Sequence, residues 1–327
     1  MKTLLVTGGA GFIGSHFVKH ILEKYNDYCV INVDKLTYAG NLDNIKEIMT
    51  LSNHKFYKGD ISDESFIKDL FKKHEIDIVV NFAAESHVDN SIKSSGLFLK
   101  TNVIGTQVLL DSAKNSWQIG KTDMGEPLFK KDCLFIQIST DEVYGSNPNS
   151  EVFTETSKLE PSNPYSASKA SADLLALSFY NTYKFPVIIT RSSNNFGTHQ
   201  HVEKLIPLMI TNALKGYKLP VYGDGMQSRD WLSVKDNVRA IDKIIHHGNI
   251  GEIYNICCQE EIINLRLIEK IISLIPNCNA RMEFVNDRLG HDTCYTMSSD
   301  KLRSELGWEP KYRLFSELDK LIDWYKS

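Results

Sequence analysis

The sequence predicts an α/β fold, a doubly wound parallel sheet with a smaller C-terminal α/β domain, and three observations carry this prediction. Short apolar runs, typical of buried parallel strands, alternate with amphipathic helical stretches up to residue 190. A glycine-rich turn, Gly8–Gly14, directly follows the first apolar run. Beyond residue 190 the alternation becomes irregular, which indicates that a second and smaller domain begins there.

Length, charge and composition narrow the class of protein. The chain has 327 residues and a net charge of −4, which does not suit a nucleic-acid binder or a protein that docks on anionic membranes. No apolar run reaches the ~20 residues of a membrane span, and the chain runs from Met1 into a strand without a signal-peptide pattern. The six cysteines, including adjacent Cys257 and Cys258, show no metal-ligand spacing. We therefore expect a cytoplasmic protein with reduced thiols and no metal.

The expected elements follow from these periodicities in chain order. Apolar runs predict strands at 3–7, 29–33, 55–58, 78–82, 134–138 and 187–190, with shorter ones at 219–222, 252–256 and 282–285. Helical periodicity predicts helices at 15–24, 64–73, 97–115, from Tyr165 onward, and near 203–215, 235–247, 264–275, 299–306 and 314–326. The segment 116–131 breaks periodicity with glycines and a proline, so we expect a loop there.

These elements predict two domains. Residues 1–190 form a Rossmann-type domain, to which 234–256 return, and the second domain comprises 191–233 and 257–327. The first domain opens with a strand, the glycine turn and a helix. In such a unit Gly8 allows the tight turn, Gly11 admits a pyrophosphate close to the backbone, and Gly14 lets the helix pack on the strand. The helix N-terminus then faces the phosphates.

The end of the second strand indicates which dinucleotide binds. Asp34 follows Gly14 by 20 residues, the position of an acid that binds the adenosine ribose hydroxyls and repels a 2′-phosphate. NAD is therefore favoured over NADP. Asp60 and Ile61 close the third strand where an adenine edge would lie, and Ala83-Ala84 after the fourth permit close approach of the cofactor.

Candidate catalytic residues follow the strand at 134–138. Thr140, Asp141 and Glu142 stand at its carboxyl end, where ligands bind in open α/β sheets. Adjacent acids are most often solvated in a loop, but within one site their pKa values are pushed apart, so that one remains a proton donor while the other is a base. Such a pair argues for an elimination step in addition to hydride transfer.

A tyrosine and a lysine complete the candidate set. Tyr165 and Lys169 lie four residues apart at the start of a helix and share one face, where the ammonium can lower the pKa of the phenol. Tyr180 and Lys184 repeat the spacing, but we expect Tyr180 to pack in the core. His87 remains open between a wall of the site and a structural hydrogen-bonder.

On these motifs the chain resembles the extended short-chain dehydrogenase/reductase family, and within it the dTDP-glucose 4,6-dehydratases. The resemblance covers nearly the whole chain and rests on the stretches Thr7–Gly14, Asp34–Asn41, Ala83–Asp89, Ser139–Gly145, Pro164–Lys169 and Arg229–Trp231. The glycine turn and the Tyr–Lys pair are shared with nucleotide-sugar epimerases and decarboxylases. The acid pair after Thr140 is specific to the dehydratases.

The resemblance implies NAD-dependent dehydration of dTDP-glucose to the 4-keto-6-deoxy sugar and water. Tyr165, with Lys169 and Thr140, would take the C4 hydroxyl proton while the C4 hydride passes to NAD⁺. Glu142 would take the C5 proton, and protonated Asp141 would donate to the departing C6 hydroxyl. The hydride would then return to C6.

The resemblance also implies binding residues and a partner. Implied NAD contacts are Gly8, Gly11, Phe12, Ile13, Gly14, Asp34, Lys35, Thr37, Asp60, Ile61, Ala83, Ala84, Tyr165 and Lys169. Implied nucleotide-sugar contacts are Ser86, His87, Asn194, Glu203, Lys204, Arg229, Asn264 and His291. Arg229 would clamp the diphosphate in bidentate geometry. A homodimer is implied, built on the helices at 97–115 and 165–183.

Three stretches depart from the family pattern and leave alternatives open. Cys257-Cys258 replace two glycines, Thr293-Cys294 replace two basic residues, and the loop 196–202 lacks a proline and aromatic residues. A UDP sugar is therefore an alternative substrate, and 4-epimerisation is an alternative reaction for which the acid pair would be superfluous. A non-catalytic NAD-binding scaffold is the alternative from another class, and it would not need Tyr165 and Lys169.

Overall fold

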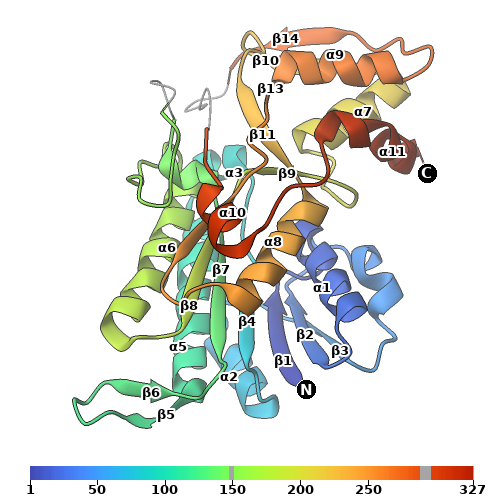
Figure 1. Cartoon of the computed structure of the whole chain (residues 1–327). Helices are drawn as coiled ribbons and strands as arrows, with labels where there is room; N and C mark the ends of the chain where they lie inside the picture. The colour runs from blue at the N-terminus through green and yellow to red at the C-terminus, as the bar shows by residue number, and fades with distance from the viewer. Residues whose placement is uncertain (147–150, 288–295, 327) are drawn as a thin grey trace.

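The computed structural model describes residues 1–146, 151–287 and 296–326. Its main layer is a seven-stranded sheet in the order β12-β8-β7-β4-β1-β2-β3, with every neighbouring pair parallel (Figure 1). The strands are β1 (Lys2–Thr7), β2 (Tyr28–Asp34), β3 (His54–Lys58), β4 (Ile78–Asn81), β7 (Leu134–Thr140), β8 (Val187–Ser192) and β12 (Ile253–Ile256). All seven residues of β2 are buried, as expected for a parallel strand covered on both faces. The doubly wound sheet is confirmed.

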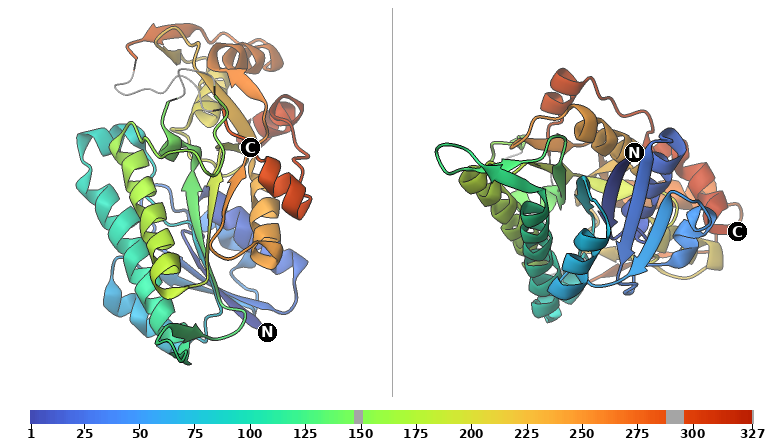
Figure 2. Two further views of the ribbon diagram at one scale, coloured as in Figure 1. Left: turned by 60° about the vertical axis from the view of Figure 1, so that its left-hand side comes forward. Right: turned by 90° about the horizontal axis from the view of Figure 1, so that it is seen from below.

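Helices cover both faces of this sheet. One face carries α1 (Phe12–Lys24) and α8 (Val234–His247), whose apolar side chains share a core with the sheet. The other carries α2 (Glu64–Lys73), α5 (Gly105–Trp117) and α6 (Pro164–Tyr183) around a second core. Helices α5 and α6 lie side by side on the flank of the molecule (Figure 2). The predicted helix at 97–115 consists of α4 (Gly96–Phe98), the π-helical η2 (Leu99–Ile104) and α5.

The smaller part of the chain builds two minor sheets above the carboxyl edge of the main one. One has the order β13-β11-β9 and the other pairs β10 with β14. Their strands are β9 (Asn194–Phe196), β10 (Leu219–Tyr222), β11 (Ser228–Ser233), β13 (Glu261–Ile263) and β14 (Met282–Val285). Three helices, α7 (Leu205–Lys215), α9 (Asn264–Leu274) and α11 (Leu314–Lys326), share a third core with them. Strand β12 nevertheless belongs to the main sheet, beside β8, as the periodicity predicted.

The remaining elements are short. They are η1 (Leu42–Ile48), α3 (Val88–Lys93), η3 (Asp141–Tyr144) and α10 (Asp300–Leu306). The loop expected at 116–131 is wrong, because β5 (Gln118–Lys121) and β6 (Pro127–Phe129) form an antiparallel hairpin there that projects from the molecule (Figure 1). Its strands are too short to show a period, and Gly125, with φ of 81°, belongs to the turn between them. Within the described ranges, no helix is long and apolar enough to cross a bilayer.

Candidate active site

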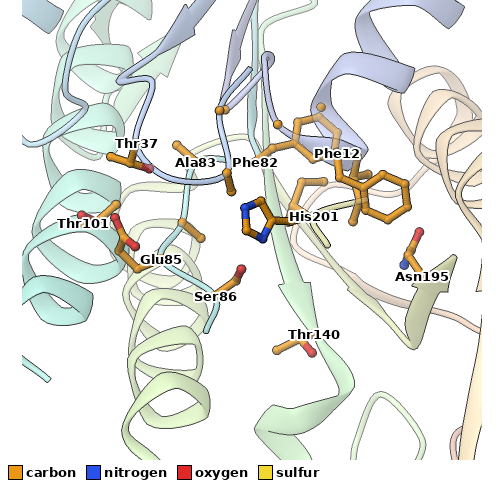
Figure 3. A pocket seen from close by; sticks show the side chains of 18 of the residues that line it. Phe12, Thr37, Phe82, Ala83, Glu85, Ser86, Thr101, Thr140, Asn195 and His201 are labelled. Carbon is orange, nitrogen blue, oxygen red and sulfur yellow. The ribbon is translucent and has the colours of Figure 1, made fainter. Parts of the chain in front are cut away.

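Two adjoining cavities lie at the carboxyl ends of the main-sheet strands. The first is lined by the segments that follow β1, β2, β4 and β7, and the second by residues of α7, β10, β11 and α9. Figure 3 shows Phe12, Thr37, Ala83 and Thr140 around the first cavity. Residues that line both are Ser86, Glu142, Asn194, Gln200, Glu203 and Lys204.

The glycine turn forms one wall of the first cavity, and each glycine has a spatial reason. Gly8 has φ of 70°, and a Cβ there would stand 2.7 Å from the Ala83 nitrogen. A Cβ on Gly14 would stand 2.2 Å from the Gly8 carbonyl oxygen. At Gly11 the space is open apart from the Gly8 oxygen at 3.2 Å among the described residues, and Gly11 is the N-cap of α1. The first-turn N–H groups of α1 are therefore placed to bind an anion.

Asp34 stands opposite, at the end of β2. Its Oδ2 accepts a hydrogen bond from the Ala10 nitrogen at 3.0 Å, and its Oδ1 accepts one from the Leu36 nitrogen at 2.8 Å. Burial raises the pKa of this carboxyl above its ordinary value. Asp34 thus also braces the glycine turn, a structural task that spacing along the chain did not reveal.

The other predicted cofactor contacts surround the same space. Lys35 and Asp60 form an ion pair of 2.8 Å. Thr37, Ile61, Ala83 and Ala84 line the cavity. An anion-binding helix start, a carboxylate and small residues in one cavity fit a dinucleotide.

The acid pair lies where β7 meets the short helix η3. The Thr140 hydroxyl accepts a hydrogen bond from the Glu142 nitrogen at 3.3 Å and donates one to Asp141 Oδ1 at 3.0 Å. Asp141 is 3% exposed, and burial, followed by the nearby charge of Glu142, raises its pKa from 3.8 to about 8. Asp141 therefore keeps its proton at neutral pH. Glu142 is half-buried and lines both cavities.

Tyr165 and Lys169 project from the first turns of α6. A capping box between Asn163 and Ser166 fixes the start of this helix. Lys169 Nζ donates to the Ile138 carbonyl at 2.6 Å, and burial lowers its pKa from 10.5 to about 8. The pKa of Tyr165 is raised well above 10, first by burial and then by Glu142 and Asp141.

The sequence-based expectation of a lowered pKa at Tyr165 is therefore wrong for this structure. The physical reason is that the phenol is buried beside two acids, while the ammonium of Lys169 donates to a strand carbonyl. The second pair behaves as expected, because the Tyr180 ring packs so closely on Gly251 that a Cβ there would stand 2.3 Å from it.

The second cavity gathers the predicted nucleotide-sugar residues that the structure describes. Ser86, His87, Asn194, Glu203, Lys204, Arg229 and Asn264 all line it. His291, Thr293 and Cys294 lie outside the described residues. Arg229 is 8% exposed and donates through Nη1 to the Ser228 carbonyl at 2.7 Å.

Polar contacts organise the rim between the two cavities. His87 Nε2 lies 3.3 Å from Glu203 Oε2, and Lys204 Nζ donates to the Ser86 carbonyl at 3.1 Å. His87 Nδ1 also accepts a long hydrogen bond from the Asn90 nitrogen at the start of α3. His87 is therefore both a wall of the cavity and a helix cap.

The comparisons with known proteins agree over the whole chain. A family model described as GDP-mannose 4,6 dehydratase matches residues 5–321. The chain belongs to this dehydratase family. Protein Agl12 of low-salt glycan biosynthesis in Haloferax volcanii is 46% identical, with 98% of both chains covered. The dTDP-glucose 4,6-dehydratase of Neisseria meningitidis is also 46% identical, over 99% of this chain and 93% of that relative.

Solved structures agree with this family. The crystal structure of dTDP-glucose 4,6-dehydratase from Bacillus anthracis, in complex with NAD, is 44% identical with a TM-score of 0.87. The match covers 100% of this chain and 97% of that one.

Within this dehydratase family framework, the structure adds site residues that motif reasoning missed. Among the described residues that line the second cavity, six have a buried polar atom without a hydrogen-bond partner, namely Asn194, Gln200, Glu203, Gln227, Trp231 and Asn264. Of these, Gln200, Gln227 and Trp231 were not among the predicted contacts. Gln227 and Trp231 stand two residues before and two residues after Arg229. Trp231 and Arg229 both belong to β11 and therefore lie on the same face of that strand. The period-2 pattern around Arg229 is the signal that points to Trp231.

The departures from the family pattern differ in their distance from the site. Cys257 and Cys258 are buried, and neither belongs to the lining of the two cavities. The Cys258 nitrogen instead donates to Asp230 at 2.8 Å. Gln200 and His201, in the loop that lacks the usual proline and aromatic residues, do line the first cavity. If these departures alter the specificity for the nucleotide sugar, we therefore expect the loop 196–202 to have a larger effect than Cys257 and Cys258.

Proposed function

We propose that this chain is an NAD-dependent nucleotide-sugar 4,6-dehydratase, a hydro-lyase that converts dTDP-glucose to dTDP-4-keto-6-deoxyglucose and water. The observation that carries the proposal is the buried Asp141, whose pKa burial raises to about 8, beside Glu142 in a cavity shared with Tyr165. The similarity to dTDP-glucose 4,6-dehydratases over 99% of the chain supports the same activity. A nucleotide-sugar epimerase would have no use for a protonated acid next to a second carboxyl.

NAD would be held by the first cavity. The turn Gly8–Gly14 with Phe12 and Ile13 would receive the pyrophosphate, and Asp34 the adenosine ribose. Further contacts are expected from Lys35, Thr37, Asp60, Ile61, Ala83, Ala84, Tyr165 and Lys169. When bound, NAD supplies the acceptor and later the donor of the hydride. The similar Bacillus anthracis structure is a complex with NAD, which supports this choice.

The residues of this chain divide the proton transfers among them. Tyr165, which Thr140 supports by a hydrogen bond, exchanges a proton with the C4 hydroxyl of the sugar. Burial and the two nearby acids favour the protonated phenol of Tyr165. The positive charge of Lys169 acts in the opposite direction and favours the phenolate. The hydroxyl of Thr140 also holds Asp141 and Glu142 in the turn.

The acids carry the elimination. Once C4 is a ketone, the C5–H bond is acidic, and Glu142 accepts that proton. Asp141 gives its proton to the C6 hydroxyl, so that the C6–O bond breaks and water leaves. Glu142 thus gains a proton and Asp141 loses one. Return of the hydride to C6 requires a proton at C5, which Glu142 supplies after exchange with solvent, and the proton that Tyr165 took from the C4 hydroxyl balances the one that Asp141 gave to the departing water. The raised pKa of Asp141, about 8, is what makes it a donor at neutral pH.

The division of labour follows the two parts of the chain. We assign cofactor binding to residues 1–190 with 234–256, and nucleotide-sugar binding to 191–233 with 257–327. In the second cavity, Arg229 would bind the diphosphate, with Asn194, Lys204 and Asn264 as polar partners. Ser86, His87 and Glu203 would contact the sugar side, and His291 is proposed from the sequence alone.

A homodimer is proposed on the flank formed by η2, α5 and α6. On this flank, Leu97 of the preceding α4 is 46% exposed, Leu99 and Ile104 of η2 are 50% and 49% exposed, and Leu174 of α6 is 58% exposed. Apolar side chains gathered on two adjacent helices favour burial against a second copy. A cytoplasmic location is proposed because both NAD and sugar nucleotides are metabolites of that compartment.

A parallel assay of the purified protein on dTDP-glucose, UDP-glucose and UDP-N-acetylglucosamine tests the substrate. The product is followed by the absorbance that a 4-keto-6-deoxy sugar develops in alkali. We expect turnover to be fastest with dTDP-glucose. Faster turnover of a UDP sugar would overturn the nucleotide assignment, and lack of a keto product from all three would overturn the dehydratase assignment.

A further inference from the structure

A buried ion pair lies directly behind the candidate catalytic residues. Asp173, on α6, is 0% exposed, and its Oδ2 accepts a hydrogen bond from Arg191 Nε at 2.9 Å. Arg191, on β8, is 1% exposed and stands beside Ser139 in the register of β7 and β8. Asp173 follows Lys169 by one helical turn and therefore lies on the same face of α6.

Hydrogen bonds connect this ion pair to η3, the short helix that carries the two acids. Arg191 Nη1 donates to the Tyr144 hydroxyl at 2.9 Å, and its guanidinium lies 4.9 Å from the centre of that ring. The Tyr144 hydroxyl in turn donates to Asn255 Oδ1 at 2.8 Å. Tyr144 is the last residue of η3, the element that begins with Asp141 and Glu142. One chain of contacts therefore joins α6, β8, η3 and β12.

We propose that Asp173 and Arg191 are positioning residues, an inference that rests on the proposed function. The pair holds α6, which carries Tyr165 and Lys169, against η3, which carries the two acids. The Asp173 carboxylate also keeps the ammonium of Lys169 charged.

The electrostatic half of this proposal follows from burial. Lys169 is 5% exposed, and burial disfavours its charged form, while Asp173 opposes this by raising the lysine pKa. Burial also raises the pKa of the Asp173 carboxyl, and the charge of Arg191 is the first influence that opposes this and favours the carboxylate. Other charged groups stand on the elements packed against α6. They are Glu142 on η3, Arg191 on β8, Lys100 on η2, Asp89 and Lys93 on α3, and Asp111 and Lys114 on α5, and Asp141 on η3 is a further titratable group. The five on η2, α3 and α5 are exposed or half-buried, so solvent weakens their effect.

A purely structural ion pair is the competing explanation. Buried pairs are weak evidence for stability, because desolvation of both charges offsets their attraction, and apolar replacements are often as stable. The competing explanation predicts that replacing the pair changes stability and leaves the titration of Lys169 unchanged. The proposal predicts in addition that the titration of Lys169 shifts when Asp173 loses its charge.

The first test is Asp173→Asn, which keeps the shape and removes the charge. We expect kcat to fall about tenfold or more, KM to stay within about twofold, and the alkaline limb of the kcat profile to move down by about one pH unit. Asp173→Glu, which restores the charge, should bring the limb back. Asp236→Asn is the matched control, because Asp236 is also 0% exposed, accepts two backbone hydrogen bonds and lines neither cavity.

A second variant separates positioning from charge. Tyr144→Phe removes only the hydroxyl that links Arg191 to Asn255 and leaves Asp173 in place. We expect a kcat lowered by about threefold to tenfold with an unmoved alkaline limb. An unchanged kcat would overturn the positioning half of the proposal.

A direct titration keeps the test independent of turnover. In protein labelled with 13C-lysine, the Lys169 signal, assigned by its loss in Lys169→Met, should titrate at lower pH in Asp173→Asn than in the parent. If Asp173→Asn does not fold, the double variant Asp173→Leu/Arg191→Met serves instead, with the same expected shift. An unshifted Lys169 titration would overturn the inference, whether or not the parent protein makes a product. Failure of the parent protein to make a product would overturn only the proposed function.

Discussion

Replacing Asp141 by asparagine should make the protein more stable and at the same time inactive. The side chain is buried, its pKa in the folded protein is about 8, and an unfolded chain would ionise it near 3.8. A raised folded-state pKa contributes stability that is fully present below the unfolded value and is lost as the pH rises through the folded value. The loss for Asp141 therefore accumulates between pH 3.8 and about 8.

The magnitude follows from the width of this window. Each pH unit within it costs about 1.4 kcal/mol, so between about pH 4.5 and about pH 7.5 the parent should lose roughly 4 kcal/mol relative to Asp141→Asn. An amide does not titrate, and it keeps the hydroxyl of Thr140 as a partner. The amide cannot deliver a proton to the C6 hydroxyl, so turnover should fall by about 10²–10⁴-fold.

Urea unfolding of parent and variant at both pH values, with NAD at equal saturation, measures the difference. All other titrating groups are common to the two proteins. A change with pH in the difference between their free energies of unfolding therefore reports on Asp141 alone. A difference that is the same at both pH values would mean that Asp141 is ionised in the folded protein. The reasoning that makes it the proton donor would then be refuted.

Three further predictions follow from contacts in the structure. Gly14→Ala should lower the NAD content of the purified protein, measured as released cofactor, because the new Cβ would stand 2.2 Å from a backbone oxygen. Gly120→Ala is the control and should keep its NAD, because a Cβ there meets open space among the described residues. Equal NAD content would contradict this. Glu142→Gln should retain NAD and fold but lose product by about 10³-fold, since no base remains for C5, and near-normal turnover would exclude Glu142 as that base. Leu174→Glu should give monomers by light scattering, because it charges a 58% exposed apolar residue on the proposed dimer flank, while Met124→Glu, at 88% exposure on the hairpin, should not. Unchanged mass for Leu174→Glu would place the interface elsewhere.

The main sheet was predictable because its strands are buried on both faces and leave continuous apolar runs. The expected strand at 134–138 lies within β7, and the one at 252–256 covers β12. The hairpin β5–β6 was missed because its partly exposed strands carry no period, and β9 and β13 are three residues long. Short strands of this kind are fixed by tertiary contacts.

The candidate site was predictable where chemistry is concentrated at strand ends. Thr140 is the last residue of β7 and Glu142 lies two residues beyond it, and the parallel topology brings such strand ends to one edge of the sheet. Trp231 and Gln227 were missed because their direction into the second cavity depends on how the minor sheets sit above the main one. The Asp173–Arg191 pair was missed because its members lie 18 residues apart on a helix and a strand, and only the fold joins them.

The most direct test of the account is the product formed from dTDP-glucose in deuterated water. Parent protein and Glu142→Gln are compared by mass spectrometry. The account predicts a product that has lost one water and carries solvent deuterium at C5, formed by the parent and not by the variant. A product of unchanged mass, or a dehydrated product formed equally well by Glu142→Gln, would contradict it.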